Sequence, residues 1–113
     1  MTTDTGFAVS TSRDATAAEP FAAGTIQWLR RAGEGGRETL SAGYWFVTPT
    51  DLPPKFELPI PVDETIYIVE GRILIEVDGV EHDVRAGGSL SVNAGATTLW
   101  TVLEDTIEFF VYS

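Results

Sequence analysis

One glutamate of this 113-residue chain stands within an apolar strand pattern. Glu64 alternates with Ile66 and Ile68, so its carboxylate shares a strand face with two isoleucines. Such a carboxylate lies at the mouth of a barrel or inside it. Burial would raise its pKa and suit it to general acid or base chemistry near neutral pH, and we predict Glu64 to be catalytic. The alternative is a solvated side chain, or one paired with Arg72 or Lys55.

His82 is the second candidate for proton transfer. It is the only histidine, and so the one side chain expected to titrate near neutral pH without perturbation. Val80 and Val84 share its strand face, whereas Glu81 and Asp83 point the other way. We predict a catalytic role for His82, with hydrogen-bonded packing as the alternative.

Aromatic and hydroxyl side chains are expected to complete a ligand pocket. The aromatic residues are too numerous for the inner core of one small barrel, so some must line a pocket or an interface. Thr98 could orient a ligand through its hydroxyl, and Trp100 shares its strand face. The predicted ligand-binding residues are Tyr44, Phe46, Glu57, Ile66, Thr98 and Trp100. Plain core packing is the alternative for Trp100 and the prediction for Phe109 and Val111.

Composition excludes several other chemistries. The chain has 17 acidic and 7 basic residues and a net charge of −10, which argues against partners such as nucleic acids and anionic membranes. The absence of cysteine excludes disulfides, thiolate nucleophiles, zinc ribbons and iron–sulfur clusters. No apolar stretch approaches the ~20 residues of a membrane span. No secretory signal is recognised, so a cytoplasmic location is expected.

Eight strand-like segments must position these residues. Runs rich in Val, Ile, Thr and aromatic residues are separated by Gly, Pro, Asn and Asp. The predicted strands are 25–31, 40–48, 64–70, 72–77, 80–85, 89–93, 97–103 and 106–112. Their lengths and spacing indicate an all-β sandwich or barrel. Glu70-Gly71 and Asp78-Gly79 put glycine where tight hairpins need a positive φ.

Two segments fall outside this pattern. Residues 49–62 contain five prolines and are predicted to be a loop or an edge segment. Residues 1–20 have no sustained period and are predicted to form a flexible or loosely docked arm, which leaves 21–113 as a single domain. The alternatives for the arm are a short helix and a swapped arm anchored on a partner subunit.

The spacing of glutamate and glycine residues resembles that of the cupin family. The first cupin motif, E-x-x-Y-x-x-E-G, has its counterpart in Glu64, Tyr67, Glu70 and Gly71, and fifteen residues separate Gly71 from the Gly87 of the second motif. The similarity covers about residues 40–112. It is greatest to the small single-domain, RmlC-like branch that includes ethanolamine-utilisation and ureidoglycine aminohydrolase-like cupins.

The resemblance implies an antiparallel jelly-roll barrel. It also implies a homodimer, because cupins of this kind are usually dimers. Tyr44, Phe46 and Phe110 could then belong to the subunit contact.

The resemblance further implies a metal bound by three histidines and one glutamate. Only Glu64 stands at one of those four positions, and Thr98 replaces the last histidine. We therefore predict that no metal or other cofactor is used. A substitute metal site of Glu57, Glu64 and His82 is the alternative.

These features together predict a metal-independent cupin that binds a small apolar or aromatic molecule in its barrel. Isomerisation, cyclisation, dehydration and lyase chemistry are the feasible reactions, because each needs only proton transfer and a shaped cavity. The alternatives are a metal-dependent enzyme with a non-standard ligand set and a non-catalytic binding or structural dimer. Because acidic residues cluster around the first motif, an anionic ligand is disfavoured.

Overall fold

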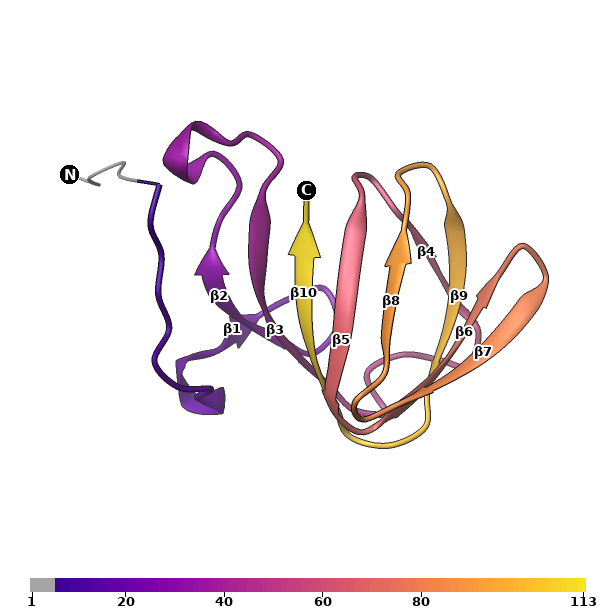
Figure 1. Ribbon diagram of the computed structural model, residues 1–113. Coiled ribbons are helices and arrows are strands. Elements are labelled where there is room, and N and C mark those ends of the chain that lie inside the picture. Colours follow the sequence, from indigo (N-terminus) through magenta and orange to yellow (C-terminus); the bar gives the residue numbers. More distant parts are fainter. Residues whose placement is uncertain (1–5) are drawn as a thin grey trace.

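Two antiparallel sheets make up almost the whole molecule (Figure 1). The computed structural model describes residues 6–113. The strand order is β1-β2-β3-β10-β5-β8 in the six-stranded sheet and β4-β9-β6-β7 in the four-stranded sheet. The strands are β1 (Glu19–Pro20), β2 (Thr25–Arg30), β3 (Ser41–Val47), β4 (Phe56–Pro59), β5 (Glu64–Glu70), β6 (Arg72–Val77), β7 (Val80–Arg85), β8 (Ser89–Val92), β9 (Thr97–Val102) and β10 (Thr106–Tyr112). Two 3₁₀ turns, η1 (Ala15–Ala17) and η2 (Glu34–Gly36), complete the fold. The predicted all-β jelly roll is confirmed.

The predicted strand bounds agree closely with the structure. Four strands, β5, β6, β7 and β10, have the predicted bounds; β2, β8 and β9 are one residue shorter at one end, and β3 is one residue shorter at each end. The Pro-rich segment contributes only the short strand β4, at an edge of the four-stranded sheet. This edge position agrees with the prediction, because proline lacks the N–H that a central strand would need.

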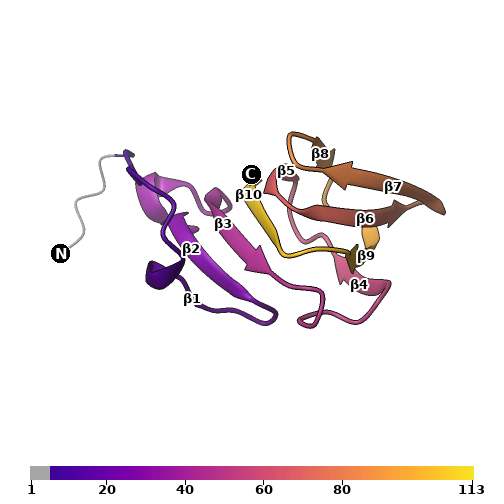
Figure 2. The same cartoon turned by 90° about the horizontal axis from the view of Figure 1, so that it is seen from below.

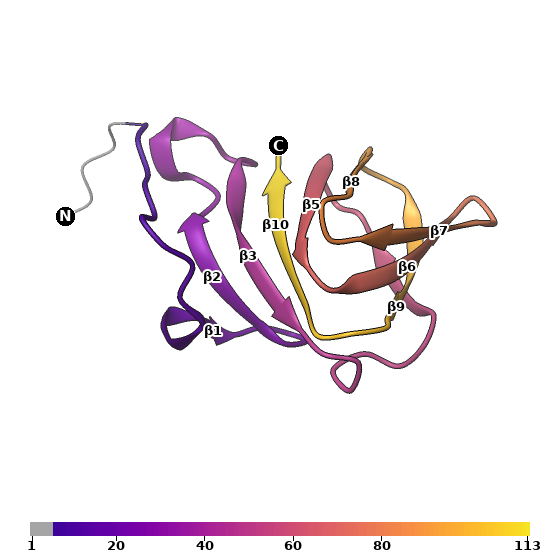
Figure 3. The same cartoon turned by 60° about the horizontal axis from the view of Figure 1, so that its bottom comes forward.

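The two sheets face each other, as the views from below and from an oblique angle show (Figures 2 and 3), and the buried apolar side chains lie between them. Ile66 and Ile68 of β5 face Ile73 and Ile75 of β6 across this core, and all four are at most 2% exposed. These are the strand faces that the alternation of apolar residues predicts. Burial of such side chains supplies most of the driving force for closing the sandwich.

The prediction was wrong for the face of β10. Phe109 and Val111 are half-buried and lie on the outer face, where the Phe109 ring packs edge-on against Tyr44 with 5.3 Å between centroids. Glu108 and Phe110, with the opposite parity, face the core side and are buried. The predicted assignment of Phe110 to a subunit contact is therefore also wrong.

Gly71 lies at a crossing between sheets and not in a hairpin as predicted. It joins β5 of one sheet to β6 of the other, and these strands do not pair. Its φ is +97°, so the positive φ is confirmed although the hairpin is not. Asp78 and Gly79, by contrast, form a tight turn between the paired strands β6 and β7, with φ of 52° and 77°.

The N-terminal arm lies beside β2 and is held to the six-stranded sheet at β2 and at the end of β5. The backbone N–H of Asp14 donates to the Gln27 side-chain carbonyl at 2.7 Å, and the Gln27 amide donates to the Ser12 carbonyl at 3.1 Å. Arg13 forms an ion pair with Glu70 at 3.2 Å. Phe7 and Val9, the anchors suggested for a swapped arm, are exposed in the single chain. The swapped arm stays a prediction. Within residues 6–113 no helix is long and apolar enough to cross a membrane.

Replacing Gly71 by alanine is expected to destabilise the fold far more than replacing Gly79. A Cβ at Gly71 would lie 2.4 Å from the Thr106 hydroxyl and 2.5 Å from the Asp105 carbonyl oxygen, whereas nothing lies within 4 Å of one at Gly79. Both variants bear the cost of a positive φ, about 1 kcal/mol, but only Gly71→Ala adds overpacking of about 1–3 kcal/mol. Urea unfolding measures the difference, and equal losses in the two variants would contradict the assignment of Gly71 as the tight corner.

Candidate functional site

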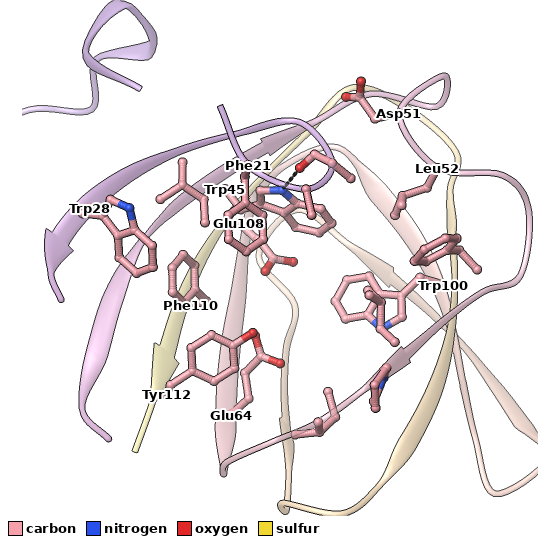
Figure 4. A pocket seen from close by; sticks show the side chains of 17 residues that line it. Phe21, Trp28, Trp45, Asp51, Leu52, Glu64, Trp100, Glu108, Phe110 and Tyr112 are labelled. Atoms are coloured by element: carbon pink, nitrogen blue, oxygen red, sulfur yellow. Dashed lines mark hydrogen bonds between the residues drawn. The ribbon is translucent and has the colours of Figure 1, made fainter. Parts of the chain in front are cut away.

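A cavity of about 220 Å³ lies between the two sheets and is lined mainly by apolar side chains, seven of them aromatic (Figure 4). Its walls come from β2, β3, β5 and β10 of the large sheet, β4 and β9 of the small one, and the loops that precede β2 and β4. The lining residues are Phe21, Ala22, Ala23, Ile26, Trp28, Trp45, Asp51, Leu52, Phe56, Leu58, Pro59, Ile60, Glu64, Trp100, Glu108, Phe110 and Tyr112.

Two buried carboxyl groups face this cavity (Figure 4). Glu64, the first residue of β5, is 6% exposed, and Glu108 of β10 is 2% exposed. Neither forms an ion pair with any residue from 6 to 113. The Glu108 Oε2 atom also has no hydrogen-bond partner within that range. An unpartnered buried carboxyl is costly, which makes it a strong indication of a site that receives a ligand.

The cations that the sequence offered to Glu64 are bound elsewhere. Arg72 donates to Asp83 at 2.7 Å, and the Lys55 ammonium lies 3.8 Å from Glu76. The alternative in which either residue neutralises Glu64 is therefore excluded. The Arg72 hydrogen bond instead lowers the pKa of Asp83 to about 2.

Burial dominates the titration of both cavity carboxyls. It raises the pKa of Glu64 from 4.5 to about 7, against the opposing effect of a hydrogen bond from the Tyr112 hydroxyl. Burial, reinforced by the charge of Glu64, raises the pKa of Glu108 well above its ordinary value. Burial and the two neighbouring carboxylates likewise raise the pKa of Tyr112. At neutral pH the site therefore holds one carboxyl near its midpoint and a second whose protonated form is favoured by burial, which suits the pair to act as base and acid.

β-sheet register brings Tyr112 to Glu64. The two residues are paired directly across β10 and β5, so the phenol ring stands beside the carboxyl group (Figure 4). Because side chains alternate along a strand, Glu108 lies on the same face of β10 as Tyr112, with Phe110 between them. The Phe110 ring packs on Tyr112 with 5.4 Å between centroids, which holds the phenol in place.

Thr98 supports the cavity wall from behind. Its hydroxyl donates to the Leu58 carbonyl and accepts from the Trp100 indole N–H, both at 2.7 Å. Trp100 in turn contacts Trp45 nearly edge-to-face at 5.9 Å. Thr98 thus fixes the ring plane of Trp100 but does not itself line the cavity.

The comparisons with known proteins agree with this geometry. Residues 34–108 match the family described as the EutQ-like cupin domain. The chain is a EutQ-like cupin. A search of curated proteins finds no match.

Solved structures show the same fold at low sequence identity. An RmlC-like cupin from Shewanella frigidimarina has a TM-score of 0.71 and 18% identity, over 94% of this chain and 92% of that one. The EutQ protein of Clostridium difficile has a TM-score of 0.64 and 19% identity, over 78% of this cupin and 65% of the EutQ chain. The cupin domain of Schizosaccharomyces pombe Cnp3 has a TM-score of 0.65 and 14% identity, over 79% and 63%.

The side chains of this cupin do not fit the metal set that the resemblance implies. Of the four implied ligand positions, only Glu64 presents a possible metal ligand to the cavity. The Thr98 hydroxyl is already hydrogen-bonded to Leu58 and Trp100. Across residues 6–113 no group of three or more histidine, cysteine, aspartate or glutamate side chains is placed to hold a metal ion. The alternative set of Glu57, Glu64 and His82 is not brought together.

The structure places only part of the predicted site at the cavity. Glu64 and Trp100 line it, and Thr98 lies directly behind it. The other predicted residues lie elsewhere: Tyr44 and Phe46 on the outer face of β3, Glu57 on the exposed side of β4, Ile66 in the core beneath the cavity, and His82 exposed on β7. The proposed site therefore does not include these five residues.

Sequence reasoning missed Glu108, Tyr112, Trp28 and Trp45. The sequence contains a pattern that could have identified Glu108 and Tyr112. These two residues and Phe110 are spaced two apart, so all three share one face of their strand. Phe109 and Val111 on the opposite face are equally apolar, and the wrong face was assigned to the core. Nothing in β10 alone indicates which of its two apolar faces is covered by a second sheet.

The wild-type protein is expected to lose stability as pH rises from about 4.5 to 7. The unfolded chain releases the Glu64 proton near pH 4.5 and the folded chain only near pH 7, so the folded state is favoured at the acidic end. The loss from Glu64 is up to about 3 kcal/mol, and Glu108 acts in the same direction. Besides each other, these carboxyls face only Tyr112 and Asp51 among the titratable groups lining the cavity.

Urea unfolding between pH 4.5 and 8 measures this dependence. Glu64→Gln is expected to be more stable than wild type at pH 8 and similar to it at pH 4.5. Glu57→Gln is the matched control, because Glu57 is exposed. A wild-type stability that stays constant or rises over this range would contradict the burial of two protonated carboxyls.

Proposed function

We propose that this EutQ-like cupin binds a small, largely apolar or aromatic molecule between its sheets and transfers protons to or from it through Glu64. The observation that carries the proposal is the Glu64 carboxyl, with a pKa of about 7, facing an aromatic cavity of about 220 Å³. A general acid or base is most effective when its pKa lies near the working pH. The cavity also has the apolar lining and few polar groups that are typical of small-molecule sites.

Glu64 serves as the base in this proposal and Glu108 as the acid. Near neutral pH the ionised form of Glu64 takes a proton from the bound molecule, with the Tyr112 hydroxyl orienting the carboxylate. Burial favours the protonated form of Glu108, which can deliver its proton to a second atom of the same molecule. The pair titrates as a unit, because the charge of Glu64 is felt by Glu108. Removal of a proton at one atom and delivery at another is what isomerisation, dehydration and lyase reactions require.

A two-stage experiment tests this function. A panel of small apolar and aromatic molecules is first screened by thermal shift on wild type and on Ala23→Leu, which fills part of the cavity lining. Ligands of the cavity are expected to stabilise wild type, since they bind only the folded state, and to lose this effect in Ala23→Leu. Each ligand is then incubated in D₂O, and deuterium incorporation into the ligand is followed by NMR.

Glu64→Gln is expected to abolish deuterium incorporation while the protein still binds the ligand. The matched control Glu57→Gln should exchange at the wild-type rate. Exchange that continues in Glu64→Gln would remove Glu64 from the mechanism. Binding without exchange in wild type would favour the alternative of a non-catalytic binding module.

We also propose that the protein is a homodimer through the outer face of its six-stranded sheet. This face carries Tyr44, Phe46 and Phe109, which are half-buried, and Tyr67, which is 48% exposed. Contiguous aromatic surface of this kind is characteristic of subunit contacts.

Light scattering after size exclusion should give twice the 12.2 kDa chain mass. Tyr67→Lys, which places a charge in the contact, is expected to give the monomer mass. Val80→Lys is the control, because Val80 is equally exposed but lies on β7 of the other sheet. A wild-type monomer, or a dimer that tolerates Tyr67→Lys, would contradict this interface.

A further inference from the structure

The side chains lining the cavity offer ring faces and oxygen atoms, but their indole N–H groups are already used. Trp45 donates to the Ala23 carbonyl at 2.7 Å, Trp100 to the Thr98 hydroxyl at 2.7 Å, and Trp28 to Glu19 at 3.0 Å. The three tryptophans therefore present π surface to a bound molecule and no free donor. The Tyr112 hydroxyl, the remaining neutral polar group, is directed at Glu64 (Figure 4).

No basic side chain among the residues that the structure describes lines the cavity. Five of the seven Lys and Arg residues form ion pairs with acidic groups elsewhere. Of the other two, Arg30 donates to the Glu34 carbonyl at 2.7 Å and Arg37 is exposed. Glu64 and Glu108 thus face a cavity that contains no positive charge to balance them.

We propose that the ligand of this cavity carries a protonated amine, which the Glu64–Glu108 pair receives while the surrounding rings enclose its apolar part. The inference rests on the proposed function, because it assigns the substrate class of the same site. The ammonium N–H groups would supply the partner that Glu108 Oε2 lacks. Ring faces attract a cation as well, through the negative charge of the π surface.

Other ligand classes fit these groups less well. A carboxylate or phosphate would meet two acids and find no cation or free indole N–H to bind it. A neutral hydrocarbon would fill the aromatic space but leave Glu108 Oε2 without a partner. An aryl- or alkylammonium ion of modest size satisfies both the carboxyl pair and the rings.

The charge balance of binding has a measurable consequence. In the empty cavity burial favours the protonated form of Glu108 and leaves Glu64 near its midpoint at neutral pH. An ammonium ion stabilises the ionised form of the pair, so binding should release a proton. The other titratable groups facing the pair are Tyr112 on β10 and Asp51 in the loop before β4. The facing residues of β2, β3, β4 and β9 are uncharged.

Three molecules of similar size and different charge test the inference. Binding of benzylamine, benzyl alcohol and benzoate to wild type is measured by isothermal titration calorimetry at pH 7.5. Benzylamine, a cation at this pH, is expected to bind at least about tenfold more tightly than benzyl alcohol, and benzoate is expected not to bind. Titration in two buffers of different ionisation enthalpy should show proton release with benzylamine and none with benzyl alcohol.

Substitutions locate the effect at the carboxyl pair. Glu108→Gln is expected to reduce the preference for benzylamine, and Glu64→Gln/Glu108→Gln to reduce the ratio to about one while benzyl alcohol binding is kept. Glu57→Gln is the matched control, because it removes one exposed carboxylate of β4 and should leave the ratio unchanged. Circular dichroism establishes that each variant is folded. The proton-release measurement needs only wild type and so remains decisive if the double variant does not fold.

The two proposals fail in different ways. Benzyl alcohol binding as tightly as benzylamine, or benzylamine binding without proton release, overturns the ammonium inference and leaves a cavity that takes neutral molecules. Absence of benzylamine binding also overturns it. Deuterium exchange into a neutral ligand that depends on Glu64, with no preference for amines, would retain the proposed function and refute the substrate class.

Discussion

The enclosure of two carboxyl groups by one aromatic wall is the constraint on which the site depends. Strand β10 lies between β3 and β5 and hydrogen-bonds to both, so its side chains must alternate strictly between the core and the outer face. That alternation carries Glu108, Phe110 and Tyr112 inward together. Because the partner strand starts at Glu64, register alone brings the second carboxyl beside Tyr112. Neither acid can turn to solvent without breaking this register.

The cost of burying these acids explains several features of the cavity. Each carboxyl is kept neutral, or partly so, by its raised pKa, because no cation lies close enough to stabilise the charged form. The rings around them exclude water and keep the local dielectric low, which strengthens any interaction with a charged ligand. Burial of the two carboxyl groups thus lowers the stability of the fold at the same place where binding and proton transfer are proposed, as is common at functional sites.

This chain has the cupin fold but lacks most of the metal ligands that the resemblance implies. The EutQ-like match and the structural neighbours account for the jelly-roll fold. Of the four metal-ligand positions that the resemblance implies, one holds Glu64 and another holds Thr98, which supports Trp100. One scaffold can carry unrelated sites, so the chemistry has to be argued from these residues and not from the family.

Sequence alone determined eight of the ten strands, the buried faces of β5 and β6, and the candidacy of Glu64, because local alternation and turn residues encode them directly. Tertiary structure decided which face of β10 is covered, and with it the second acid Glu108 and the phenol of Tyr112. It also places His82 and Glu57 outside the cavity, because their strands lie at sheet edges and these side chains are exposed. The physical reason is that alternation defines two faces of a strand, whereas only the packing of one sheet on the other decides which face becomes the interior.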